Sequence, residues 1–299
     1  MTIEVGGAAG GGSVIGDVKP MYIDDVGGLA VINGESWLKT GVIDDDLVTY
    51  PDAKTGIIAG GVYTGTSFSV AGQETLPAGI TWDGTHFWVV GFSTDSVYKY
   101  TALGVYTGTS FSVAGQSIDP YGITWDGTSF FITDGVSSTI FKYTSAGVYT
   151  GTSFNAATGE TQLADITWDG TYFWVVGGRF DKIYQHNAAG TYTGVNYYVG
   201  GQDIQPAGIT WDGTHLWVVG AATGAAYKYT TGGVYTGTSF SVAGQEGSAG
   251  GITWDDSNLW VVGYGTDAAY KYTADLPHVG IASQDFDAST GLPIYTRVK

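Results

Sequence analysis

The chain has 299 residues, a formal net charge of −17 and only 11 lysine and arginine residues, which argues against binding to the phosphates of nucleic acids or to an anionic membrane surface. It contains no cysteine, so disulfides, zinc–thiolate sites and a cysteine nucleophile are excluded. With 49 glycines, 7 prolines and 43% hydrophobic residues, the composition favours short strands joined by tight turns.

Residues 1–60 are predicted to form a glycine-rich leader and a β-hairpin that serves as an anchor segment. Leu29 to Ile32 and Ser36 to Thr40 are strand-like runs separated by Asn33-Gly34, a pair favoured in hairpin turns. A segment of this size buries little apolar surface alone, so we expect it to dock on a partner, on copies of itself or on the rest of the chain. The start of the chain lacks the basic and long apolar stretches of a secretory signal.

A unit of 43 residues recurs five times within residues 61–275. The motif ITWDG, or ITWDD in the last copy, begins at Ile80, Ile123, Ile166, Ile209 and Ile252. The motif GVYTGTSFSV, or a variant, begins at Gly61, Gly104, Gly147, Gly190 and Gly233. A period of about 40 to 45 residues without a helical apolar period is typical of a β-propeller. The sequence therefore predicts an all-β propeller of five blades.

Each unit is predicted to supply four strands, A to D, which in the first full copy are Ala78 to Trp82, Thr85 to Gly91, Ser96 to Thr101 and Val105 to Val113. Asp83-Gly84 joins A to B and suits a type I′ turn, in which both central residues have positive φ. A first copy of strand D, Val62 to Val70, precedes every strand A, and the last unit lacks its own. We therefore predict that this N-terminal strand completes the fifth blade and closes the ring.

The unit resembles the blades of NHL-type and related propellers, in which a short inner strand leads through an Asp-Gly turn to an apolar second strand. The residues that carry the resemblance are Gly79, Ile80, Trp82, Asp83, Gly84, Val89, Tyr98, Lys99 and Tyr100, with their equivalents at 43-residue steps. The resemblance implies the fold. It leaves the function open, because such propellers include lectins, enzymes and scaffolds.

Two aromatic positions in each unit are predicted to pack the blades together. The first position, predicted as the structural blade core, holds Trp82, Trp125, Trp168, Trp211 and Trp254. The second holds Trp88, Phe131, Trp174, Trp217 and Trp260. Full burial of one ring stabilises by roughly 4 to 6 kcal/mol at most. The aspartate after each first tryptophan is interpreted as a turn residue, with a fivefold carboxylate ring for a cation as the alternative.

The D-to-A and B-to-C loops hold most of the differences between units, and both lie at the same end of the strands. Loops on a rigid scaffold commonly carry recognition, and aromatic and acidic side chains suit sugar stacking and hydroxyl binding, although neutral drift gives the same pattern. The residues predicted to bind a receptor or ligand are Phe92, Asp95, Tyr121, Asp134, Arg179, Phe180, Asp181 and Tyr264. Acids also open four D-to-A loops and are expected to be solvated surface charge, with weak cation binding as the alternative, namely Glu74, Glu160, Asp203 and Glu246.

The sequence predicts no enzyme, no cofactor and no metal site. Glycoside hydrolysis requires a pair of carboxylates at a defined separation, and the acids expected near the propeller axis are interpreted as repeated turn residues. No nucleophile elbow, P-loop, dinucleotide fingerprint or HExxH motif occurs.

Residues 276–299 are predicted to form a C-terminal extension that ends in a basic strand, Ile294 to Lys299. The N-terminal VINGESWLKTGVID followed by TYPDA, together with the final GLPIYTRVK, resembles the terminal segments of tail-fibre and related virion proteins of tailed bacteriophages. This resemblance implies a virion structural protein, a tail fibre or adhesin on the tail or outer surface of the particle. Its N-terminal part would attach to the particle and its propeller would bind a host surface glycan or protein.

The partners implied are other virion proteins, a host receptor and further copies of the chain, without nucleic acid and without membrane insertion. Two alternatives remain open at this stage. One is a capsid decoration or other tail component that binds no receptor, and the other is a lectin-like propeller of non-phage origin.

Overall fold

The structure, a computed structural model, describes residues 61–156 and 159–274, together with six short strands in the flanking segments. Contacts between residues divide the chain into Ala59–Ala274 and a second unit that combines Met1–Ile58 with Asp275–Lys299. No helix among the described residues is long and apolar enough to cross a membrane.

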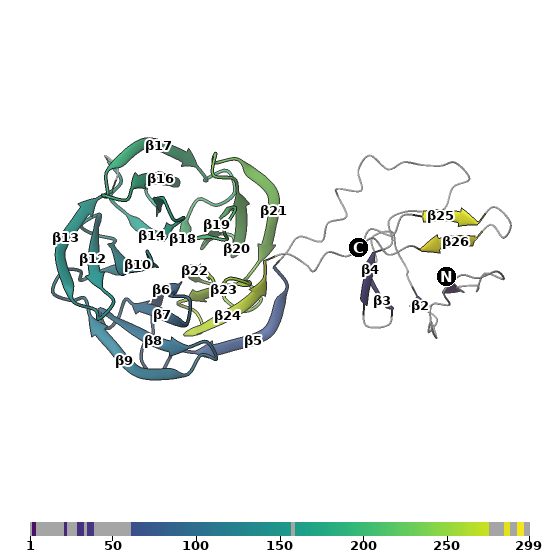
Figure 1. Cartoon of the computed structure of the whole chain (residues 1–299), viewed down its shortest axis with the longest axis horizontal. Helices are drawn as coiled ribbons and strands as arrows, with labels where there is room; N and C mark the ends of the chain where they lie inside the picture. The colour runs from purple at the N-terminus through teal and green to yellow at the C-terminus, as the bar shows by residue number, and fades with distance from the viewer. Residues whose placement is uncertain are drawn as a thin grey trace. The chain divides into compact units, whose positions relative to one another are not determined.

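Five antiparallel sheets of four strands form a ring around one axis (Figure 1). Blade 1 consists of β6 (Pro77–Trp82), β7 (His86–Gly91), β8 (Ser96–Thr101) and β9 (Tyr106–Ser112). Blade 2 consists of β10 (Pro120–Trp125), β11 (Ser129–Asp134), β12 (Thr139–Thr144) and β13 (Tyr149–Asn155). Blade 3 consists of β14 (Leu163–Trp168), β15 (Tyr172–Gly177), β16 (Lys182–Asn187) and β17 (Tyr192–Tyr198). Blade 4 consists of β18 (Pro206–Trp211), β19 (Leu216–Gly220), β20 (Ala225–Tyr229) and β21 (Tyr235–Ser241). The predicted five-bladed propeller is confirmed.

Blade 5 joins the two ends of the repeat region. Its strands are β22 (Ala249–Trp254), β23 (Asn258–Gly263), β24 (Ala268–Thr273) and β5 (Tyr63–Ser69). In the pairing of β24 with β5, Ala269 lies opposite Phe68 and Tyr272 lies opposite Tyr63. The predicted closure by the N-terminal strand D is therefore confirmed, and no blade is left with only three strands.

The flanking segments contain three antiparallel strand pairs. The first joins β1 (Thr2–Ile3) to β2 (Met21–Tyr22), the second β3 (Leu29–Ile32) to β4 (Glu35–Leu38), and the third β25 (Gln284–Asp287) to β26 (Leu292–Tyr295). The predicted N-terminal hairpin corresponds to β3 and β4, with the second strand one residue earlier at its start. The predicted C-terminal strand is two residues earlier at its start, and 296–299 lie outside the described residues.

The turn between strands A and B differs from the predicted type I′. Only Gly84 and its equivalents, including Asp256 in blade 5, have positive φ, and Asp83 does not. The Asp83 carboxylate instead accepts hydrogen bonds from the backbone N–H groups of Thr85 and His86, at 2.8 and 2.7 Å. The prediction was wrong because the aspartate shapes this turn through its side chain, not through a left-handed backbone.

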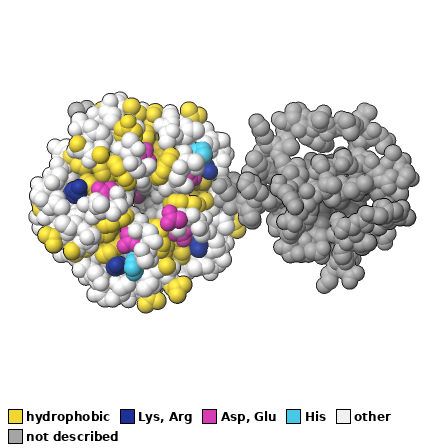
Figure 2. Space-filling view, viewed as in Figure 1, with side chains coloured by type: hydrophobic (Ala, Val, Ile, Leu, Met, Phe, Trp, Pro, Cys, Tyr) yellow, Lys and Arg dark blue, Asp and Glu magenta, His cyan; other side chains and the backbone are white. Residues whose placement is uncertain are grey.

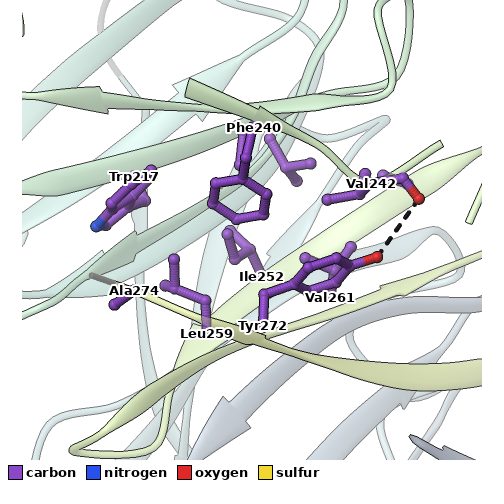
Figure 3. Close-up of a cluster of buried hydrophobic side chains, with 11 residues drawn as sticks. Trp217, Phe240, Val242, Ile252, Leu259, Val261, Tyr272 and Ala274 are labelled. Carbon is purple, nitrogen blue, oxygen red and sulfur yellow. Dashed lines mark hydrogen bonds between the residues drawn. The ribbon is translucent and has the colours of Figure 1, made fainter. Parts of the chain in front are cut away.

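Adjacent blades pack through aromatic residues of strands B, C and D. Between blades 4 and 5, Trp217 and Phe240 from one blade meet Tyr272 from the other, with the Phe240 and Tyr272 ring centres 5.3 Å apart (Figure 3). The Tyr272 hydroxyl donates to the Val242 carbonyl at 3.4 Å. Equivalent clusters lie at the other blade junctions, so the second aromatic position holds the ring of blades together.

Candidate functional site

The five innermost strands approach one another closely at the position of Gly79. A Cβ atom added to Gly251 would lie 2.7 Å from the Gly79 Cα, and one added to Gly122 would lie 2.4 Å from the Asp165 Cα. Four of the five blades therefore have glycine here, and only blade 3 carries a side chain, Asp165. This residue interrupts the repeat at the axis of the propeller.

Asp165 is fully enclosed, with 1% of its surface exposed. Its Oδ1 accepts a hydrogen bond from the Ile166 N–H at 2.8 Å, and its Oδ2 accepts one from the Ile209 N–H of blade 4 at 2.9 Å. The Ile123 N–H of blade 2 contributes another. Burial raises the pKa of Asp165 well above its usual range, although these backbone N–H groups oppose that effect. The carboxyl group thus ties three blades together.

Asp165 corrects the interpretation that the acids near the axis are repeated turn residues. It occurs in one unit of five, and it lies inside β14, directly before the ITWDG motif of blade 3 that begins at Ile166. An acid at a position that is otherwise glycine was a signal available in the sequence.

Aromatic residues from three blades surround the axis on the side of the D-to-A and B-to-C loops, here called the loop face. The rings of Phe92 (blade 1) and Tyr121 (blade 2) meet edge to face with centres 5.6 Å apart. Burial raises the pKa of Tyr264 (blade 5) above its usual range, and the nearby groups of Tyr121, Asp165 and Asp119 add to the effect. We call Phe92, Asp119, Tyr121, Asp165 and Tyr264 the axial cluster.

The axial cluster is one-sided. The position of Tyr121 in the repeat is occupied by small residues in the other blades, namely Ala78, Ala164, Ala207 and Gly250. The position shared by Phe92 and Tyr264 is likewise small elsewhere, with Gly135, Gly178 and Ala221. Large aromatic groups therefore come from blades 5, 1 and 2, and small residues come from blades 3 and 4. Aromatic faces, phenol hydroxyls and carboxyl groups set in such an arrangement suit a polar ligand with apolar patches.

Asp119, like Asp165, is a member of the axial cluster that the sequence interpretation did not select. Burial raises its pKa above the usual range, and the carboxylates of Asp134 and Asp95 add to the effect. A Cβ added to Gly135 would lie 2.6 Å from the Tyr121 ring and 3.1 Å from the Asp119 carboxylate. The glycine therefore makes the room that both side chains occupy.

Asp95 and Asp181 have a backbone role that their loop position did not reveal. Both have positive φ, as do all their equivalents at 43-residue steps: Asp95 (47°), Ser138 (56°), Asp181 (52°), Gly224 (60°) and Asp267 (52°). Aspartate and glycine tolerate this conformation better than most residues. The Asp95 and Asp181 carbonyls accept hydrogen bonds from the Val113 and Val199 N–H groups, so these residues shape the loop.

Arg179 and Phe180 belong to blade 3 and form their own surface pair. The Arg179 guanidinium lies 5.0 Å from the centre of the Phe180 ring and donates to the Thr161 hydroxyl at 3.0 Å. Phe180 is 41% exposed. No contact among the described residues joins this pair to the axial cluster. Of the eight predicted binding residues, Phe92, Tyr121 and Tyr264 are thus brought together and Arg179 and Phe180 are separate.

The acids that open the D-to-A loops are buried, which overturns the expectation of solvated surface charge. Glu74 is 1% exposed and Glu246 is 0% exposed. Glu74 accepts hydrogen bonds from the Leu76 N–H at 2.7 Å and the Thr94 hydroxyl at 2.6 Å, and also from the Ser93 hydroxyl. Each acid therefore ties the D-to-A loop to the B-to-C loop of the same blade.

In blade 2, Asp134 at the end of β11 is the carboxylate that ties the D-to-A loop to the B-to-C loop. There the D-to-A loop has Ser117, whose hydroxyl donates to Asp134 at 2.6 Å, and Asp134 is 2% exposed. Burial opposes the ionisation of Asp134, but hydrogen bonds from Ser117 and Ser137 outweigh it and hold its pKa below the usual range. Asp134 therefore fixes the loops and does not present its carboxylate to a ligand.

The first tryptophans and the turn aspartates lie on the opposite side of the disc, the turn face. Trp82 is half-buried, as are all its equivalents, whereas Trp174 and Trp217 at the second position are 1% and 0% exposed. The Trp88 indole donates to the Asp83 carboxylate at 2.6 Å, and blades 3 to 5 repeat this bond. No group of three or more histidine and acidic side chains among the described residues could hold a metal ion.

His186 in blade 3 stands where the other blades have tyrosine. It is completely buried, neither ring nitrogen has a hydrogen-bond partner, and burial lowers its pKa from 6.5 to about 4. In the other blades the tyrosine hydroxyl donates to a glutamine, as Tyr100 does to Gln73, but blade 3 has Gly159 at the glutamine position. Blade 3 has thus lost both members of this pair.

We expect His186 to make the propeller less stable in acid. The unfolded chain protonates near pH 6.5 and the folded chain only near pH 4, so protonation favours the unfolded state between these values. The free energy of unfolding should fall by about 3 kcal/mol across that range from this group. A His186→Phe variant should lack this component, measured by urea unfolding at several pH values. An identical pH dependence in the variant and the wild type would contradict the assignment.

No protein-family model matches the chain, and no curated protein matches it in sequence. Among solved structures, a glutaminyl cyclase from Myxococcus xanthus is similar with a TM-score of 0.57 and 11% identity, over 72% of this chain and 96% of that one. A virginiamycin B lyase from Staphylococcus aureus is similar with a TM-score of 0.45 and 17% identity, over 82% of this chain and 93% of that one. A nidogen/laminin complex gives a TM-score of 0.45 and 17% identity, over 62% and 72%.

The similarity to the glutaminyl cyclase concerns the fold, because the identity is low. It nevertheless corrects the prediction that this chain is not an enzyme. That prediction treated the propeller as a scaffold without catalytic acids, yet a protein named for an enzymatic activity shares the fold over nearly its whole length. The prediction also assumed that the acids near the axis are repeated turn residues. The enclosed Asp165 removes that argument, because it is a single, unrepeated acid at the axis. The chain is thus a five-bladed β-propeller whose fold is similar to that of the glutaminyl cyclase.

Proposed function

We propose that this protein is a recognition protein of a tailed-bacteriophage particle, and that its propeller binds a host surface glycan through the axial cluster. The observation that carries the proposal is that Phe92, Tyr121 and Tyr264 occur once each within a nearly exact fivefold repeat and come together on the loop face. Aromatic residues that break the fivefold repeat and lie together on one face give the asymmetry that a single ligand requires.

The chemistry of the axial cluster supports a neutral glycan. Half-buried tyrosine rings offer apolar faces to sugar C–H groups, and their hydroxyls with the Asp119 carboxyl offer hydrogen bonds to sugar hydroxyls. The net charge of −17 and the acids beside the tyrosines disfavour an anionic ligand.

The assignment to a phage particle is supported by the terminal segments, which resemble those of tail-fibre and related virion proteins. In this proposal residues 1–60 attach to other virion proteins, copies of the chain associate, and the protein resides on the outer surface or tail of the particle. A host surface protein is the alternative receptor, and a capsid decoration or a non-phage lectin is the alternative role. Electron microscopy of particles bound by an antibody to the propeller would distinguish a distal fibre from a capsid site.

Recognition by the axial cluster is tested with a glycan array, followed by titration of the glycans that bind. We expect Tyr121→Ala to weaken binding about tenfold or more, which corresponds to about 1.4 kcal/mol, because it removes one aromatic wall of the cluster. Tyr121→Phe should retain most of the stacking and lose only the hydroxyl. Ile204→Ala, an exposed side chain on a blade 4 loop, serves as the control.

The wild type binding no glycan, or Tyr121→Ala binding as tightly as Ile204→Ala, would refute recognition by the axial cluster. Mass spectrometry of the glycans after incubation shows in the same experiment whether the bound sugar is changed chemically.

A further inference from the structure

The first tryptophan of each blade presents part of its indole on the turn face. One side of the Trp82 ring packs on Phe87 with centres 4.7 Å apart, and Trp125 and Trp168 pack on Phe130 and Phe173 in the same way. All five first tryptophans are only half-buried. The propeller in Figure 2 shows hydrophobic side chains gathered around the centre of one face, with acidic and basic side chains between them.

One of the five indole N–H groups has a hydrogen-bond acceptor among the described residues, and that acceptor is an aspartate whose position is glycine in the other four blades. The Trp82 Nε1 of blade 1 donates to the Asp256 Oδ2 in the A-to-B turn of blade 5 at 3.0 Å. The other first tryptophans have no hydrogen-bond partner for this N–H among the described residues, namely Trp125, Trp168, Trp211 and Trp254. Their indole N–H groups are also not buried. An exposed aromatic surface with a free donor is thus repeated four times.

The difference between the blades comes from one residue position. Asp256 occupies the turn position that is glycine in the other blades, and all five have positive φ: Gly84 (90°), Gly127 (95°), Gly170 (94°), Gly213 (94°) and Asp256 (71°). A Cβ added to any of these four glycines would meet no atom within 4 Å. In blade 5 a carboxylate oxygen extends from this position to the indole of the next blade. In the other four blades glycine stands here, so no side chain extends from this position toward the indole.

We propose that the turn face carries four equivalent binding positions for neutral saccharide units, each formed by a first tryptophan and the A-to-B turn of the preceding blade. The pairs are Trp125 with Gly84, Trp168 with Gly127, Trp211 with Gly170 and Trp254 with Gly213. A sugar oxygen accepts the indole N–H bond in the place that the Asp256 carboxylate takes beside Trp82, and sugar C–H groups lie against the exposed indole edge. The fifth position is closed by Asp256.

A neutral, hydroxylated ligand fits this surface better than an anionic one. The turn of each blade carries an aspartate, as at Asp83, and the chain has a net charge of −17, so a negatively charged ligand would be repelled. An isolated position of this kind is small and binds weakly. Four positions on one face would bind a repetitive polysaccharide much more tightly through avidity, by about 10² or more when the spacing matches.

The test follows the indole N–H signals of the full chain, labelled with ¹⁵N-tryptophan, by NMR during titration with glucose, galactose, mannose and N-acetylglucosamine at millimolar concentrations. Tryptophan-to-phenylalanine variants assign the signals. We expect one of these sugars to shift the signals of Trp125, Trp168, Trp211 and Trp254 together and to leave the Trp82 signal unchanged.

Two variants of one residue make the test specific. Asp256→Gly should make the Trp82 signal respond like the other four, raising the number of sites from four to five, and it should fold well because glycine suits a φ of 71°. Asp256→Asn keeps an acceptor oxygen at the same place, so the Trp82 signal should not shift when the sugar is added. Conversely, Gly213→Asp should abolish the response of Trp254 alone.

The proposal is overturned if none of the four sugars shifts the four signals, or if Trp82 responds in the wild type as the others do. It is also overturned if Asp256→Gly leaves the Trp82 signal silent. These positions are independent of the axial cluster, because they lie on the turn face. The Tyr121→Ala variant should therefore retain the response of all four indoles, and failure of one proposal leaves the other standing.

Discussion

Replacing Phe68 with alanine should lower the free energy of unfolding by about 3 to 5 kcal/mol. Phe68 lies on β5, the strand that closes the ring, and it is 8% exposed. Its ring centre lies 5.5 Å from that of Phe87 and 5.4 Å from that of Tyr100, both in blade 1, and 5.5 Å from that of Trp260 in blade 5. Removing the ring therefore weakens the junction between the first and the last blade, measured as a loss of stability in urea.

The matched control is Phe111→Ala, at the equivalent position of β9 in blade 1. Phe111 also packs against the next blade, where its ring centre lies 5.8 Å from that of Phe130. Its strand follows the other three strands of its blade in sequence, whereas β5 is held to β24 only by pairing. Both variants should lose stability, but only Phe68→Ala should speed amide exchange in β5 and β24 under native conditions. Equal exchange of β5 in the two variants would argue against β5 as the weak point of the ring.

The fold was predictable because its signals are periodic. The 43-residue step and the displaced copy of strand D are visible in the sequence, and each was confirmed by the sheet order and by the pairing of β24 with β5. The conformation of the turn between strands A and B was harder to predict. The Asp83 side chain binds the backbone of its own turn, so a rule based on positive φ alone selected the wrong turn type.

The candidate site was predictable only in part. Phe92, Tyr121 and Tyr264 stood out as aromatic residues in otherwise small positions, but their meeting on the loop face depends on contacts between blades that are far apart in sequence. Glu74 looked like an exposed loop acid, because its partners Ser93 and Thr94 lie 19 and 20 residues away in the other loop. The sequence did hold one clue, since blade 2 alone has serine at the glutamate position and aspartate at the facing glycine position.

Blade 2 has its carboxylate at Asp134 and a serine at Ser117, the reverse of the other blades. We therefore predict that substitutions at these two positions have strongly coupled effects on stability. A Cβ at the facing glycine position collides with the acid in the other blades, as at Gly91 and Glu74. Ser117→Glu alone should place two carboxylates in one buried space, and Asp134→Gly alone should leave the Ser117 hydroxyl and the Val136 and Ser137 N–H groups without their acceptor. We expect each single variant to lose about 2 kcal/mol or more of unfolding free energy.

The double variant Ser117→Glu/Asp134→Gly should return close to wild-type stability, because it recreates the arrangement of Glu74 with Gly91 in blade 1. The coupling free energy from the double-mutant cycle, measured by urea unfolding, should therefore be about 4 kcal/mol in the favourable direction, the sum of the two single losses. Ser117→Glu combined with Leu103→Ala, where Leu103 is 89% exposed, should show simple additivity. If the losses of the two single variants add in the double variant, the two loops are not held by a shared carboxylate, and the burial of these acids needs another explanation.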